Sequence, residues 1–123
     1  MTKKAALPYD VRLECIAYVR GYPRRVQECA RAGGRYPAME IIKMQAVEHA
    51  LANCGRDIAN DNIRHKLAQS IMRNCQGTHK YSRNKISIPG ISEATFSRRK
   101  EKFLRDIAIY SGMIAKVDTN SGL

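Results

Sequence analysis

The stretch "GISEATFSRRKEKFLRDIAIYSGMI", residues 90–114, carries a helix-start signal and an apolar stripe of helical spacing. Ser92 is a favoured helix N-cap, and Glu93 places a carboxylate in the first turn, where the helix dipole stabilises it. With about 100° between successive residues, one face of the predicted helix collects Phe96, Phe103, Leu104, Ile107, Tyr110 and Ile114. We expect this face to be buried in the core.

The opposite face of the same predicted helix is cationic. Thr95, Arg98, Lys102 and Arg105 follow at spacings of 3, 4 and 3, and residues 80–105 hold eight Lys or Arg against two Glu. Few acidic residues lie one turn away to neutralise this charge, so we expect DNA phosphates to do so, while side chains at the helix start meet base edges. The candidate DNA-binding residues are Ser92, Glu93, Thr95, Ser97, Arg98, Arg99, Lys102, Arg105, Lys80, Arg83 and Lys85.

Helical signals recur along the rest of the chain, whereas strand signals are almost absent, which predicts an all-α fold. Residues 8–22 are expected to form a first helix that buries Val11, Cys15, Ile16, Tyr18 and Val19. Proline is tolerated in the first turn of a helix, so we expect Pro23 to start a second segment, which Gly33-Gly34 ends. Residues 31–37 have the composition of a linker.

Two further core helices are predicted, over residues 38–54 and 57–75. The first has the apolar stripe Ile41, Met44, Val47 and Leu51, and Gly55 is placed to end it. The second has the stripe Ile63, Leu67, Ile71 and Met72, with Asp57 or Asp61 available as its N-cap and Gly77 at its end. Both stripes are expected to form core rather than to contact a cofactor.

Residues 78–90 complete neither a helical nor a strand pattern, and we expect a short helical turn or a loop, with a tight turn at Pro89-Gly90. The segment "PGISEAT" is similar to the turn and recognition-helix start of helix-turn-helix proteins, where glycine permits the turn and the aliphatic residue enters the core. One small helical domain is therefore predicted. It comprises a helical core at 8–75 that could also serve oligomerisation, a helix-turn-helix-like DNA-binding segment at 78–114 and a tail at 115–123, of which "VDTNSGL" is expected to be disordered.

The chain is strongly basic, because 22 Lys and Arg against 11 Asp and Glu give a formal charge of +11. A polyanionic partner is expected, either nucleic acid or an anionic membrane surface. Membrane-surface binding needs a large exposed apolar face, usually with Trp, whereas this sequence has no Trp and needs its apolar stripes for its own core. No secretory signal or spanning segment is recognisable, so we expect a cytoplasmic protein without a membrane partner.

The cysteines give no sign of a metal site or of catalysis. Cys15, Cys29, Cys54 and Cys75 have no CxxC spacing, and the three histidines form no ligand pair. Each cysteine lies in or beside an apolar stripe, which favours a small buried side chain over a nucleophile. Gly33-Gly34 is not followed by the GK[ST] of a phosphate-binding loop. We expect no enzyme activity, no metal and no cofactor.

Three stretches together resemble the phage-encoded RinA/ArpU-type late transcriptional regulators: "LPYDVRLECIAYVRGYPRR" at 7–25, "AVEHAL" at 46–51 and "GISEATFSRRKEKFLRDIA" at 90–108. The most specific matches near the C-terminus are Ile91, Ser92, Thr95, Phe96, Arg98, Arg99, Lys100, Phe103, Leu104, Asp106, Ile107, Ala108, Gly112 and Ile114. Members typically carry a helix-turn-helix like that of sigma-factor region 4. The resemblance implies a phage or prophage activator that binds double-stranded DNA at late promoters, and it leaves contact with RNA polymerase and homodimer formation open.

Two alternatives use the same cationic face. A helix-turn-helix DNA-packaging subunit of the small-terminase kind would add self-association, with residues 8–32 and 38–54 as a symmetric interface. A non-specific nucleic-acid-binding protein would need the phosphate contacts alone. A ring of about eight or more subunits would favour packaging, since a promoter-binding regulator is usually a monomer or dimer.

Overall fold

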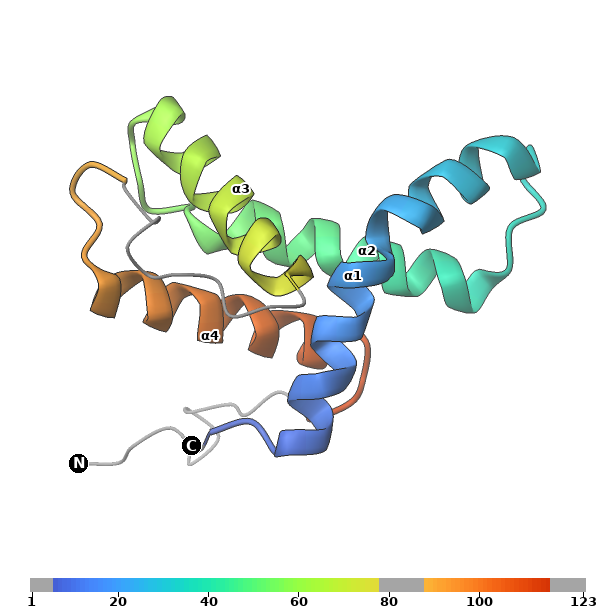
Figure 1. Cartoon of the computed structure of the whole chain (residues 1–123). Helices are drawn as coiled ribbons and strands as arrows, with labels where there is room; N and C mark the ends of the chain where they lie inside the picture. The colour runs from blue at the N-terminus through green and yellow to red at the C-terminus, as the bar shows by residue number, and fades with distance from the viewer. Residues whose placement is uncertain (1–5, 78–87, 116–123) are drawn as a thin grey trace, which may run out of the picture.

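The computed structural model describes residues 6–77 and 88–115, which form four α-helices around one core (Figure 1). These helices are α1 (Tyr9–Ala32), α2 (Ala38–Cys54), α3 (Asp61–Gln76) and α4 (Glu93–Tyr110). The described residues contain no β-strand, and their one isolated bridge joins Ile88 to Ile91. The predicted all-α class is therefore confirmed.

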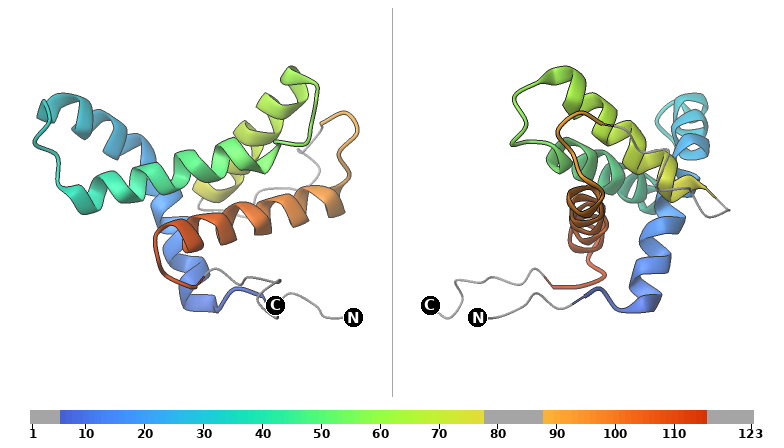
Figure 2. Two further views of the ribbon diagram at one scale, coloured as in Figure 1. Left: turned by 180° about the vertical axis from the view of Figure 1, so that it is seen from behind. Right: turned by 60° about the vertical axis from the view of Figure 1, so that its left-hand side comes forward.

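The core lies where α2, α4 and the first half of α1 meet, and α3 covers its remaining side. The most extensive packing is between α4 and α2, and α1 contacts all three other helices. Figure 2 shows α4 running below α2 and α3, with the beginning of α1 crossing near the C-terminal end of α4. The largest fully buried side chains are Phe103, Leu67, Ile71, Leu104 and Ile107.

The first helix is longer than predicted. The expectation that Pro23 starts a second segment is wrong, because α1 continues through Pro23 and ends where Gly33 adopts a left-handed φ of 58°. Proline removes one backbone hydrogen bond and crowds the preceding turn, and the helix bends in its middle rather than breaking (Figure 1). The predicted stripe is confirmed: Val11, Cys15 and Val19 are buried, and Ile16 and Tyr18 pack against them.

Beyond the bend, residues 21–32 of α1 and residues 38–45 of α2 lie side by side and extend away from α3 and α4; we call this hairpin the arm (Figures 1 and 2). A buried arginine joins the two helices across the arm. Arg25 of α1 donates to Glu40 of α2 at 2.9 Å and to the Tyr18 carbonyl of its own helix at 3.3 Å. Hydrogen bonding therefore helps to hold the two helical segments of the arm together beyond the end of the apolar core.

The stripe predicted for α2 is confirmed in its second half, where Val47 is buried and Leu51 packs against the core, whereas Ile41 and Met44 are only partly buried. Of its four members only Val47 is fully buried, and the side chains that α2 buries are Ala46, Val47, Ala50 and Cys54. The N-terminal half of α2 lies in the arm, so its large side chains do not reach the core. Small residues on the C-terminal half permit neighbouring helices to approach closely.

The predicted stripe of α3 is confirmed, because Leu67 and Ile71 are buried and Ile63 and Met72 pack beside them. Its cap is different from the two candidates. Asn60 is the N-cap, and its side-chain oxygen accepts a hydrogen bond from the Ile63 amide at 3.0 Å. Asp61 is the first helical residue, one position too late to cap, and Asp57 lies in the preceding loop. Gly77 follows the last residue of α3, as predicted.

Candidate nucleic-acid interface

A tight turn leads into α4, as predicted. The Ile91 amide donates to the Ile88 carbonyl at 3.0 Å, and Gly90 between them has a φ of +79°, which glycine adopts without steric cost. Ser92 then caps the helix, because its hydroxyl accepts a hydrogen bond from the Thr95 amide at 3.1 Å. The start of α4 is thus determined by contacts within seven residues.

The two faces of α4 are separated as the sequence predicts, with one exception. Phe96, Phe103, Leu104 and Ile107 are buried, and Ile114 packs partly against the core after the helix has ended. Tyr110 is 43% exposed instead of buried, because it is the last residue of α4 and its ring lies against His49 at the surface, with 5.0 Å between centroids. Among the predicted DNA-binding residues, Ser92, Glu93, Ser97, Arg98 and Lys102 are exposed, and Thr95, Arg99 and Arg105 are half-buried.

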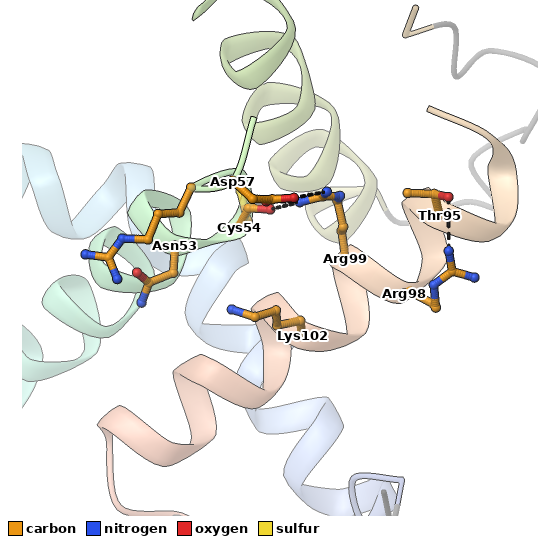
Figure 3. A pocket seen from close by; sticks show the side chains of 8 residues that line it. Asn53, Cys54, Asp57, Thr95, Arg98, Arg99 and Lys102 are labelled. Atoms are coloured by element: carbon orange, nitrogen blue, oxygen red, sulfur yellow. Dashed lines mark hydrogen bonds and ion pairs between the residues drawn. The ribbon is translucent and has the colours of Figure 1, made fainter. Parts of the chain in front are cut away.

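Arg98 and Lys102 lie on a ridge between two open clefts, because both residues line both of them. The first cleft, about 800 Å³, lies between α4 and the end of α2 and is lined by Asn53, Cys54, Arg56, Asp57, Thr95, Arg98, Arg99 and Lys102 (Figure 3). The second, about 760 Å³, lies between α4 and the beginning of α1 and includes Arg12, Ser97 and Arg105. The ridge is the most accessible basic part of α4.

The contacts of the two ridge cations are weak and local. Arg98 donates to the Thr95 hydroxyl at 3.1 Å, and Lys102 pairs with Asp106 one turn later at 3.3 Å. An exposed pair of this kind contributes only about 0.3–0.5 kcal/mol. Both side chains can therefore exchange their present partner for an external anion at little cost.

Arg99 has a different role from its neighbour Arg98. Its guanidinium donates two hydrogen bonds to the Asp57 carboxylate, of 2.8 and 2.7 Å, and one to the Cys54 carbonyl, of 3.0 Å (Figure 3). Its side chain is only 22% exposed. Arg99 therefore fastens α4 to the end of α2, and its assignment as a DNA contact stays a prediction.

The partner of Arg99 lies beyond the reach of the sequence prediction, which concerned acidic residues one turn away on α4 itself. The carboxylate that neutralises Arg99 comes from a loop 42 residues away, and Glu101 forms an ion pair with Arg12 of α1. Hydrogen bonding to Arg99 lowers the pKa of Asp57 to about 2. The same hydrogen bonding raises the pKa of Arg99.

We expect Asp57→Asn to destabilise the fold in a pH-dependent way. A carboxyl whose pKa is about 2 in the folded chain and 3.8 ordinarily stabilises the fold above pH 4, and this contribution is lost as the pH falls through 2. The difference in free energy of unfolding between wild type and variant should therefore shrink between pH 5 and pH 2. Urea unfolding followed by circular dichroism measures it, and a constant difference would contradict a charged clamp.

Arg56 and Asn53 line the first cleft, and the sequence analysis did not select either residue. Arg56 is exposed and follows α2 in a loop. A Gly-Arg-Asp sequence after a helix is the one local signal that could have drawn attention to it. That Arg56 faces the same cleft as Arg98 depends on how α2 packs against α4.

Several predictions fall on residues that the structure does not describe. Lys80, Arg83 and Lys85 lie outside the described residues, as does nearly all of the predicted tail at 115–123. A helix-turn-helix needs a first helix directly before the turn. Since α3 ends at Gln76 and α4 begins at Glu93, that helix would fall within residues 78–87, which also lie outside the described part.

Three of the cysteines are buried and Cys29 is partly buried. Burial raises the pKa of Cys15 to about 12 and also raises the pKa values of Cys54 and Cys75. A nucleophilic thiol requires the opposite shift. Within residues 6–77 and 88–115, no three His, Cys, Asp or Glu side chains are grouped in a way that could hold a metal ion.

None of the four described helices combines the length and the hydrophobicity that crossing a membrane requires. Comparison with protein-family models, with curated proteins and with solved structures finds no match for this chain.

Proposed function

We propose that this protein binds double-stranded DNA through the exposed side of α4 and acts as a sequence-specific transcriptional regulator. The observation that carries the proposal is the ridge of Arg98 and Lys102. It lies on the N-terminal half of a capped helix whose opposite face is anchored in the core. Both cations are exposed and have only weak internal partners, which is the arrangement needed to exchange solvent for phosphate.

In the proposed complex the first two turns of α4 enter the major groove. Ser92, Glu93 and Ser97 are exposed there and are short or polar enough to meet base edges, where Ser can donate or accept and Glu can accept from cytosine. Arg98 and Lys102 reach guanine edges or the flanking phosphates. Burial of Phe103 and the grip of Arg99 on Asp57 hold the helix rigidly while it does so.

The regulatory part of the proposal rests on the resemblance to RinA/ArpU-type proteins in residues 7–25, 46–51 and 90–108. On that basis the protein is phage- or prophage-encoded and activates late genes, with RNA polymerase as a candidate partner. A regulator must prefer one DNA sequence over others, whereas a non-specific nucleic-acid-binding protein does not. Selection of bound sequences from random duplex DNA tests it: one enriched sequence supports a regulator, and the absence of enrichment contradicts sequence-specific binding.

Binding to DNA is expected to weaken steeply as salt is added. If about five cations meet phosphates, the logarithm of the association constant should fall with the logarithm of the salt concentration with a slope of roughly −4 to −5. Fluorescence anisotropy with a labelled duplex at 50–300 mM salt, a range chosen to resolve that slope, measures it. Affinity that does not change over this range would contradict a phosphate-binding surface.

A further inference from the structure

The corner formed by residues 53–58, the last two residues of α2 and the first part of the loop before α3, is packed against α3. Gly55 is buried, and a Cβ at this position would lie 3.0 Å from the Arg64 side chain and 3.5 Å from Leu67. A larger residue at this position would force the Arg64 side chain to shift by a few tenths of an ångström. The Ile58 amide also donates to the Gly55 carbonyl at 2.9 Å, which closes the loop into a compact corner.

Two arginines fasten this corner from opposite sides. Arg64 of α3 donates to the Ile58 carbonyl at 2.7 Å. Arg99 of α4 donates to the Cys54 carbonyl at 3.0 Å and grips Asp57 with both terminal nitrogens. The corner is thus held in one position relative to α4, although it is exposed at the surface.

Arg56 lies between these anchored positions and lines the first cleft together with Arg98 and Lys102. Arg56 is exposed, and no residue in the described part of the chain accepts a hydrogen bond from its side chain. The cleft-lining side chains comprise four cations and a single carboxylate, Asp57, which Arg99 already engages. Figure 3 shows Lys102 extended from α4 toward the side of the cleft formed by the end of α2. The cleft therefore offers cations from two separate elements to one anion.

We propose that the corner at residues 53–58 is a second DNA-contacting element, in which Arg56 binds a backbone phosphate beside the groove occupied by α4. This inference rests on the proposed function. A guanidinium suits the paired oxygens of a phosphodiester. Arg56 lies outside the helix that enters the groove, so its contact positions the duplex and does not read its sequence.

The test compares Arg56→Ala with Arg35→Ala, using the full chain and a labelled duplex. Each variant loses one exposed arginine and therefore the same net charge, but Arg35 lies in the α1–α2 connection at the end of the arm, away from α4 (Figure 1). We expect Arg56→Ala to make the salt slope shallower by about 1 and to weaken binding equally for specific and unrelated duplexes. Arg35→Ala should keep the wild-type slope.

An Arg56→Ala slope equal to that of the wild type would overturn the inference and leave the proposed function standing, provided that Arg98→Ala with Lys102→Ala abolishes binding. If that double variant binds normally, the proposed function itself fails. Titration with inorganic phosphate, followed by NMR of the arginine side chains, tests whether the cleft binds a free anion rather than the phosphates of the DNA backbone. Saturation of the cleft at micromolar phosphate together with an unchanged salt slope in Arg56→Ala would assign it to the free anion and overturn the inference.

Discussion

Phe103→Ala is expected to remove a large part of the stability of the fold. Phe103 is the largest fully buried side chain, with no exposed surface, and it lies at the middle of the α4 stripe that packs against α2. Truncating a buried Phe to Ala costs about 3–5 kcal/mol, because the transfer free energy is lost and a cavity remains. A domain of this size is typically stable by about 5–15 kcal/mol. Urea unfolding followed by circular dichroism should show a large shift of the midpoint.

Tyr110→Ala is the matched control for this prediction. Tyr110 belongs to the same sequence stripe and has an aromatic ring of similar size, but it is 43% exposed and contacts His49 at the surface. Its truncation is expected to cost less than about 1 kcal/mol. If the two variants lost the same free energy of unfolding, Tyr110 would be as deeply buried as Phe103. The packing described here would then be contradicted.

Arg98→Ala combined with Lys102→Ala is expected to abolish DNA binding while leaving the helical content intact. Loss of two contacts worth about 1–3 kcal/mol each weakens binding by about 30-fold to roughly 10,000-fold. The fold should tolerate the change, because the partners of the two side chains, Thr95 and Asp106, lie on α4 itself. Anisotropy measures binding, and circular dichroism of the same samples measures helicity.

Arg31→Ala combined with Arg35→Ala removes the same charge from the end of the arm. Both residues are exposed and lie away from α4. This control is expected to bind DNA within a few-fold of the wild type, since it changes only the long-range field. Full binding by the Arg98 and Lys102 double variant would place the DNA surface elsewhere on the molecule, and equal losses in both double variants would point to net charge alone.

The parts of the fold that depend on local interactions could be predicted. Ser92 caps α4 because its hydroxyl and the Thr95 amide are three residues apart, and the buried stripe of Phe96, Phe103 and Ile107 follows from helical periodicity. The stripes of α1 and α3 were predictable for the same reason. In each case the decisive contacts lie within one or two turns, or the apolar face is so distinct that only one side can be buried.

Predictions failed where a distant element decides the outcome. The sequence favours a helix boundary at Pro23, but α1 continues through it, and Arg25 after the proline donates to the Tyr18 carbonyl before it and to Glu40 of α2. In α2 the predicted stripe members Ile41 and Met44 stay partly exposed while Ala50, outside that stripe, is buried, because only the C-terminal half of the helix lies against the core. Periodicity identifies an apolar face, but it does not say how much of that face a neighbour covers.

The candidate site divides in the same way. The sequence by itself determined that α4 exists, where it begins, which of its faces is apolar and that the other is cationic, because these properties depend on cap geometry and on residue spacing. Only the tertiary structure decided which cations remain available. Arg98 and Arg99 are adjacent and chemically identical, yet Asp57, 42 residues before Arg99, binds Arg99 and leaves Arg98 exposed beside Arg56. The physical reason is that a charge in a folded chain is neutralised by its neighbours in space, and the packing of α2 against α4 selects those neighbours.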